Sequence, residues 1–321
     1  EIFKIFERFW EENCLEYSTS SAPELHIVGA QPGAGKTALV SKIGKEKNIL
    51  TLIGDIYRTL HPNYRNILNS DRYSEFTGPL NGYLSMLVVS RCIDRGISFV
   101  LETSMNNIDL LKKNIEKAKN NGYLVNMNLL VAKKEDSFLS IYYRYAKLIE
   151  CNVGNRLTQE KFHDEGYKNI TSFLSDDNTL SKLNSISIHN RNLTSIIFQE
   201  EIRGNINQLR DKSIKAINNE RKRRPTFDEQ KNTKEQEKFV LDCIDKGLIK
   251  TITKDDFLKK RAIKSYCCGK YSPKIFKPIA KKSNILFGKF NNPELKGGRR
   301  HFKCNNDSAQ VKQCLKQIDE K

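Results

Sequence analysis

A lysine and a threonine follow a glycine turn in the stretch QPGAGKT, residues 31–37. Gly33 and Gly35 allow backbone N–H groups to close around phosphate oxygens, and a helix beginning at this point adds the positive end of its dipole. Lys36 would reach the β- and γ-phosphates of a nucleotide, and the hydroxyl of Thr37 would ligate Mg²⁺. The residue types and their spacing therefore predict a nucleotide site.

The stretch departs from the strict pattern G-x-x-x-x-G-K-[ST] at its first glycine, which is Ala30 here. Alanine serves at that turn if its backbone angles are ordinary. The apolar run at 25–28 predicts a buried strand before the loop, and residues 35–47 have helical character, which is the context that a phosphate loop requires. The predicted nucleotide-binding residues are Gly33, Ala34, Gly35, Lys36, Thr37 and Ala38, with Thr37 as the metal ligand.

Asp55 directly follows a second apolar run, residues 48–53. Ligands of open α/β sheets collect at the carboxyl ends of strands, where a carboxylate orients and deprotonates an acceptor hydroxyl. The same position suits the N-cap of a helix over 56–61, a role that aspartate fills well. The residue alone leaves both interpretations open.

Further apolar runs at 97–102, 123–132 and 185–188 alternate with helical patterns. Strands separated by helices predict an α/β fold, a P-loop kinase-like parallel sheet with helices on both faces. Residues 2–10 carry apolar side chains at helical spacing and predict an amphipathic first helix. One further helix is predicted from the apolar face formed by Leu80, Tyr83, Leu84, Leu87, Val88 and Cys92.

The segments GAQPGAGKT, GDIYRTLHPNY and VLETS together resemble the zeta toxin family, the kinases of bacterial toxin–antitoxin pairs. In that family an aspartate six residues before a His-Pro pair is the catalytic base, and this spacing selects Asp55. Arg144 and Arg156, the latter seven residues before His163-Asp164, resemble the family's two arginines. The resemblance covers about residues 22–200.

Physical chemistry gives such arginines a role, because a permanently charged planar donor stabilises the charge on a phosphoryl group in transfer. The alternative is that each pairs with a surface carboxylate. The resemblance places Glu102 and Ser104 in the substrate region. By itself Glu102 is equally a metal carboxylate or a plain residue at the end of a strand.

The resemblance implies a kinase that uses ATP and Mg²⁺ to phosphorylate a hydroxyl of UDP-N-acetylglucosamine, which starves cell-wall synthesis. It also implies an antitoxin partner that covers the ATP site and contacts the first helix. Two positions depart from relatives: Met86 replaces a glutamate, and Asn106 replaces an arginine that some relatives carry. NAD or another nucleotide sugar therefore stays open as the acceptor.

The net charge of +17 is concentrated at the C-terminus, where residues 251–321 hold 18 lysines and arginines against 6 aspartates and glutamates. This basic region has no recognisable fold. Aromatic residues interleaved with its lysines suit nucleic acid or a small packed subdomain, and the second is favoured. A nucleotide- or nucleic-acid-binding module that uses this tail is the alternative class. Truncation near residue 250 separates the classes, because an enzyme should keep its turnover.

Four segments are predicted: a helix at 1–21, the kinase domain at 22–200, a helical extension at 201–250, whose first helix spans 200–224, and the basic region at 251–321. Residues 224–238 suit a linker or a solvated helix. No apolar run reaches the roughly 18 residues of a membrane span, so a cytoplasmic protein is expected. Zinc is disfavoured because the spacing of its candidate ligands is poor; they are Cys267, Cys268, His301, Cys304 and Cys314.

Overall fold

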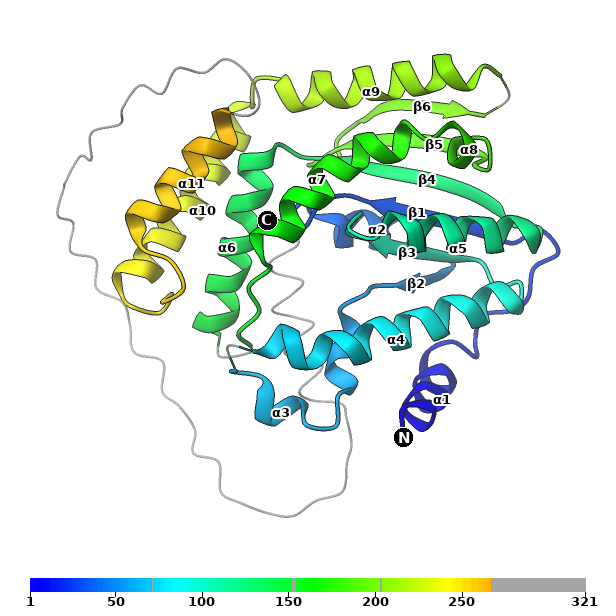
Figure 1. The fold of residues 1–321 in the computed structure, drawn as a ribbon, viewed down its shortest axis with the longest axis horizontal. Helices are drawn as coiled ribbons and strands as arrows, with labels where there is room; N and C mark the ends of the chain where they lie inside the picture. The colour runs from blue at the N-terminus through cyan, green and yellow to red at the C-terminus, as the bar shows by residue number, and fades with distance from the viewer. Residues whose placement is uncertain (71, 152–153, 203, 267–321) are drawn as a thin grey trace.

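The computed structural model describes residues 1–70, 72–151, 154–202 and 204–266 (Figure 1). Its sheet has the strand order β2-β3-β1-β4-β5-β6, and all neighbours are parallel except β5 and β6. The predicted α/β fold with a mainly parallel sheet is confirmed. The strands are β1 (Glu24–Gly29), β2 (Leu50–Leu52), β3 (Phe99–Thr103), β4 (Leu124–Val131), β5 (Ser185–Asn190) and β6 (Ile196–Glu201).

Helices cover both faces of this sheet. The 3₁₀-helix η1 spans Ile56–Leu60, and the α-helices of the described residues are α1 (Ile2–Asn13), α2 (Lys36–Lys47), α3 (Tyr64–Ile67), α4 (Tyr73–Asp94), α5 (Ile108–Asn120), α6 (Lys134–Glu150), α7 (Glu160–Leu174), α8 (Asp177–Leu180), α9 (Ile206–Lys222), α10 (Phe227–Asp245) and α11 (Lys254–Tyr266). Residues of α2 pack with Val28 and Leu130 in one apolar cluster. Residues of α4, α5, α7 and α9 pack with Leu25 and Ile27 in another. Because β1 contributes to both clusters, its apolar residues Leu25, Ile27 and Val28 are buried on both faces of the strand.

A first helix forms at the apolar spacing of residues 2–10 and packs with one face against the body, but it ends at Asn13, short of the predicted segment 1–21. Phe6, Phe9 and Trp10 are buried. Arg91 of α4 lies over the ring of Phe6 at 4.1 Å and pairs with Glu7 at 2.6 Å, which fixes α1 on α4.

The predicted helix over 200–224 begins later than expected, because residues 196–201 form β6. This strand pairs with β5 and covers an edge that would otherwise expose unpaired backbone groups. Residues 224–238, where a linker or a solvated helix was expected, contribute most of α10. A capping box between Thr226 and Glu229 starts that helix, because each side chain bonds the other's backbone N–H.

The helices α10 and α11 pack on α6 through a third apolar cluster (Figure 1). Phe138, Tyr142 and Phe257 meet there, with Phe257 wholly buried. The domain boundaries at 200 and 250 stay predictions. The candidate zinc ligands and most of the basic region lie outside the described residues. No helix that the structure describes is both long and apolar enough to span a membrane.

Candidate active site

The loop between β1 and α2 is shaped by its two glycines. Gly33 has φ 77°, and a Cβ built on it would lie 2.1 Å from the carbonyl oxygen of Ser137 in α6. Gly35 has φ 95° and precedes α2 without a capping side chain. The backbone N–H groups at the start of α2 are therefore left to an anion, as the predicted nucleotide site requires.

Ala30 fits the turn where the strict motif has glycine. It is fully buried, and it is not among the described non-glycine residues with positive φ. Its N–H donates to the carbonyl of Thr103 at 3.3 Å. Alanine meets no steric penalty there, as the sequence argument required.

Lys36 is held against its own loop, where its ammonium group donates to the carbonyl of Gln31 at 3.1 Å. Burial lowers the pKa of Lys36, while the carboxylates of Glu102 and Asp55 raise it and the guanidinium of Arg144 lowers it further. Glu102, Asp55 and Arg144, which are far apart in the sequence, therefore act on one buried ammonium group.

Asp55 lies at the N-cap position of η1, but its side chain makes no capping hydrogen bond. Its carboxylate accepts instead from Arg156 and, at 3.3 Å, from Arg58. Burial alone would raise the pKa of Asp55, but Arg156, Arg144 and Arg58 outweigh it and hold that pKa well below its usual range. Asp55 is thus ionised. Its carboxylate bonds two arginines and does not cap η1.

The two arginines reach the same place from different elements. Arg144 projects from α6 and donates to the hydroxyl of Thr158 at 3.0 Å. Arg156 lies between α6 and α7 and pairs with Asp55 across 101 residues of sequence. The carboxylate that Arg156 contacts is therefore the predicted base and not an unrelated surface group.

The loop after β3 carries Ser104 and Asn106 and is held by α7. A Cβ on Gly166 would lie 2.5 Å from the carbonyl oxygen of Ser104 and 3.2 Å from the Cα of Gln31. Glu102 is the next-to-last residue of this strand, opposite Val28 of β1, and its charge acts on both Lys36 and Arg156. The predicted acceptor residues thus lie beside the phosphate loop.

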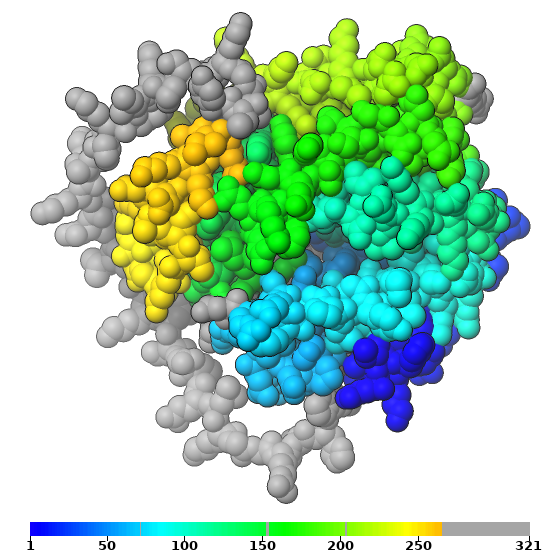
Figure 2. Space-filling view, in the orientation of Figure 1, coloured from blue at the N-terminus to red at the C-terminus, as the bar shows by residue number. Residues whose placement is uncertain are grey.

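In the space-filling view the surface is hollowed between α4 and the α6–α7 region, and residues near the N-terminal end of the colour scale show at its floor (Figure 2). Met86 on α4 is 46% exposed. The side-chain oxygen of Asn106 is buried and has no hydrogen-bond partner among the described residues. The side chain of Met86 is therefore accessible to an acceptor, whereas the oxygen of Asn106 is enclosed beside Gly166 of α7.

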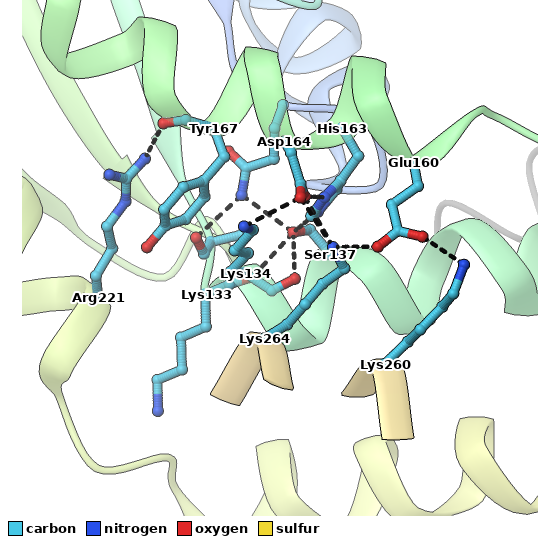
Figure 3. A network of polar contacts seen from close by, with 12 residues as sticks. Lys133, Lys134, Ser137, Glu160, His163, Asp164, Tyr167, Arg221, Lys260 and Lys264 are labelled. Carbon is cyan, nitrogen blue, oxygen red and sulfur yellow. Dashed lines mark hydrogen bonds and ion pairs between the residues drawn. The ribbon is translucent and has the colours of Figure 1, made fainter. Parts of the chain in front are cut away.

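A buried polar network that the sequence did not predict lies under the loop (Figure 3). His163 is fully buried, with Nε2 2.8 Å from Ser137 Oγ and Nδ1 2.8 Å from Asp164 Oδ1. The side-chain amide of Gln31 donates to Ser137 Oγ at 3.1 Å and to the carbonyl of Ala132 at 3.0 Å. The His163-Asp164 pair served only as a spacing marker in the sequence, where nothing indicated that it joins the loop.

Arg191, in the turn between β5 and β6, is a second residue that the sequence did not indicate. It contacts the hydroxyl of Ser140 and approaches the carbonyl of Gly33 at 3.5 Å. Its contacts lie 51 and 158 residues away in sequence, so no local pattern reveals them. Arg191 adds a further cation at the outer side of the phosphate loop.

Comparison with known proteins agrees with this geometry. The family model described as zeta toxin matches residues 10–203. Toxin PezT of Streptococcus pneumoniae is 31% identical over 153 residues, 46% of this chain and 60% of PezT, so less than two thirds of that relative is spanned. Toxin zeta of Enterococcus hirae is 25% identical over 199 residues, 59% of this chain and 69% of that protein.

A solved structure from the PezAT chromosomal toxin–antitoxin system of Streptococcus pneumoniae superposes with a TM-score of 0.61. The match has 21% sequence identity and covers 76% of this chain and 96% of that one, which shows a shared fold. The loop, Asp55, Arg144 and Arg156, on which the resemblance rested, meet at one edge of that fold. With a family model that matches well over half of its length, the chain belongs to the zeta toxin family.

Proposed function

We propose that the protein is a toxin kinase that transfers the γ-phosphoryl group of ATP to a hydroxyl of UDP-N-acetylglucosamine. The observation that carries the proposal is the convergence of Lys36, Asp55, Arg144 and Arg156 at the carboxyl edge of the sheet. These residues supply the charges that phosphoryl transfer needs on both sides of the moving group. Family membership supports the same reaction class.

In the proposed reaction the acceptor hydroxyl approaches Asp55. The hydroxyl oxygen bonds to the γ-phosphorus while the bond between the γ-phosphorus and the β–γ bridging oxygen breaks. The hydroxyl proton passes to Asp55, and ADP leaves with the bridging oxygen. A carboxylate with so low a pKa is a weak base. It suffices because the transition state is loose and the proton moves late, so that Asp55 mainly orients the acceptor.

Cations would stabilise the charge that spreads over the transferred group. Arg156 already neutralises Asp55, so acceptor binding requires its guanidinium to turn toward the phosphoryl oxygens. Arg144 approaches from α6, and Lys36 exchanges the carbonyl of Gln31 for a phosphate oxygen. Arg156 and Lys36 therefore change partners when the substrates bind, and they stabilise the transition state from the positions that they reach in that complex.

The residues present suit a magnesium ion bound together with the nucleotide. The half-buried hydroxyl of Thr37 lies in the first turn of α2, and the carboxylate of Glu102 acts electrostatically on the same lysine. No group of three or more His, Cys, Asp or Glu in the described part of the chain is placed to hold a metal alone. Such a site suits Mg²⁺, which keeps waters and phosphate oxygens as ligands and would neutralise the β- and γ-phosphates.

We infer an antitoxin partner and a cytoplasmic location, since PezT comes from a toxin–antitoxin system. Ile2 and Phe3 of α1 are 41% and 60% exposed, which leaves an apolar end of the first helix for such a partner. Binding of nucleic acid through residues 251–321 is not favoured.

A second acceptor class is supported by Met86 and Asn106. An exposed methionine cannot accept hydrogen bonds from sugar hydroxyls as a glutamate can, and Asn106 lacks the positive charge of the arginine that some relatives carry. The alternative function is therefore the same phosphoryl transfer to NAD or another nucleotide sugar.

The test is a transfer assay with ATP and Mg²⁺ against UDP-N-acetylglucosamine, UDP-glucose, NAD and a 5′-hydroxyl oligonucleotide. Asp55→Asn is the inactive variant, and Asp211→Asn is the matched control, because the side chain of Asp211 is 73% exposed on α9. Product from UDP-N-acetylglucosamine that disappears only with Asp55→Asn supports the proposal. Transfer to another acceptor alone selects the second class, and no transfer to any acceptor refutes the kinase.

A further inference from the structure

Two lysines are buried in the described part of the chain: Lys36 of the phosphate loop and Lys264 of α11, which is 3% exposed. Lys264 lies beyond residues 10–203, which match the family model. Its ammonium group pairs with Asp164 at 2.9 Å and with Glu160 at 2.8 Å, both on α7, and lies over the ring of Phe138 at 4.8 Å (Figure 3). Burying an ammonium is costly and adds little net stability even when it is paired, so its geometry calls for another explanation.

The contacts of Asp164 determine which way the hydrogen bonds point. An ionised carboxylate only accepts, so His163 donates to it through Nδ1–H. A neutral imidazole then has Nε2 free to accept, and burial keeps His163 neutral by lowering its pKa to about 4. Ser137 Oγ is the donor within reach of Nε2, although the carbonyl oxygens of Lys133 and Lys134 can accept the same proton, and Oγ accepts from the amide of Gln31.

Gln31 connects these hydrogen bonds to the phosphate loop. Both protons of its side-chain amide are engaged, one by Ser137 and one by the carbonyl of Ala132. Its backbone carbonyl accepts from Lys36 Nζ at 3.1 Å and from the N–H of Ala34 at 3.3 Å. The last side chain in this series of hydrogen bonds is thus that of Gln31, whose backbone carbonyl accepts from Lys36.

We propose that Lys264 is a positioning residue of the nucleotide site, which acts through Asp164, His163 and Ser137 on Gln31. By this relay the C-terminal helix α11 becomes part of the kinase. The proposal rests on the proposed function for turnover, but nucleotide binding tests it without any acceptor.

The experiment compares Lys264→Met with Lys260→Met in the full chain. Lys260 lies on the same helix and pairs with Glu160 at 2.7 Å, but its side chain is 42% exposed and does not contact Asp164. Affinity for the magnesium complex of a non-hydrolysable ATP analogue is measured by calorimetry. We expect Lys264→Met to weaken binding about 10-fold, as is usual when a residue that orients a ligand-binding group is lost, and Lys260→Met to change it less than about 2-fold.

Action through Asp164 is tested by a double-mutant cycle with Asp164→Asn. The double variant Lys264→Met/Asp164→Asn removes both charges of this pair and serves as the folding control; Glu160 keeps its pair with Lys260, while Lys134 loses its pair with Asp164 in both Asp164→Asn variants. We expect the double variant to bind the analogue as weakly as Asp164→Asn alone. If the double variant instead loses affinity by the product of the two single losses, Lys264 does not act through Asp164.

Nitrogen NMR of His163 supplies a readout that a merely structural lysine would not change. The wild-type ring should show the Nδ1–H tautomer, and Lys264→Met should raise its pKa because one of the two neighbouring ammonium groups, Lys264 and Lys134, is lost. Unchanged nucleotide affinity in folded Lys264→Met overturns the proposal. Wild-type protein that binds the analogue but phosphorylates nothing refutes the kinase alone, whereas wild-type protein that binds no analogue refutes both.

Discussion

At the residue scale, the site depends on side chains whose partners lie far away in the sequence. The spacing of Asp55 before a His-Pro pair and of Arg156 before His163-Asp164 selected two residues that are in contact in the structure, although 101 residues of sequence separate them. Sequence showed which groups are able to do chemistry. It could not show that the carboxylate of Asp55 and the guanidinium of Arg156 neutralise each other, because only the fold brings them together.

Arg156→Lys is expected to lower kcat by at least about 100-fold, because a lysine lacks the planar fork that spans two phosphoryl oxygens. Arg210→Lys on α9, where the native arginine pairs with Asp177 on the surface, is the matched control and should leave kcat unchanged. Steady-state kinetics with saturating ATP measure both. Equal rates for Arg156→Lys and wild type would assign Arg156 a purely structural role.

His163 predicts how stability depends on pH. The imidazole takes up a proton near pH 6.5 in the unfolded chain but only near pH 4 in the folded protein, because burial lowers its pKa. Between these values the unfolded state binds more protons, so the stabilisation present above pH 6.5 is lost as pH falls to 4. The loss amounts to about 3 kcal/mol.

Urea unfolding of wild type and His163→Gln at pH 7, 5.5 and 4 measures this contribution. His26 and His189 also have lowered pKa values, but they titrate in both proteins and cancel in the comparison. Between pH 7 and pH 4 the unfolding free energy of wild type should fall by about 3 kcal/mol more than that of His163→Gln. Parallel slopes would mean that folding does not shift the pKa of His163.

At the element scale, strands with two buried faces and the loop between β1 and α2 were predictable, since continuous apolar runs and glycine turns are local signals. The strand β6 was missed because it is an edge strand, whose burial is only partial and whose pairing depends on β5. The helix α11 was missed because its stretch is rich in lysine. Because a lysine-rich sequence predicts exposed side chains, it did not predict that Phe257 and Lys264 are buried.

The two glycines of the phosphate loop should respond differently to alanine. Gly33→Ala places a methyl group 2.1 Å from a backbone carbonyl of α6, which must move, whereas a Cβ at Gly35 meets no atom within 4 Å. Both positions have positive φ, so an alanine at either one also adds roughly 1–2 kcal/mol of backbone strain. Gly33→Ala should therefore lower both the melting temperature and the nucleotide affinity more than Gly35→Ala does. The reverse order in calorimetry would show that α6 does not support the loop.

At the scale of the whole molecule, the position of α11 changes where the functional part of the chain ends. Charge composition placed a boundary near residue 250 and made truncation there a test of the basic tail. The structure packs residues on both sides of that point, Val240 and Phe257, into one cluster on α6. Truncation at 250 would thus remove part of the packed body together with the tail.

Two truncations separate these effects. A chain ending at residue 250 loses the wholly buried Phe257, worth about 3–5 kcal/mol as a core aromatic, and leaves Asp164 and Glu160 without Lys264. A chain ending at Tyr266 keeps these contacts and lacks only the residues beyond α11. The shorter chain should melt at a lower temperature and bind the ATP analogue weakly, while the longer one should match the full protein in both respects and in turnover. Loss of turnover in the chain ending at Tyr266 would instead assign an essential role to residues 267–321 and favour the class in which the basic tail carries the function.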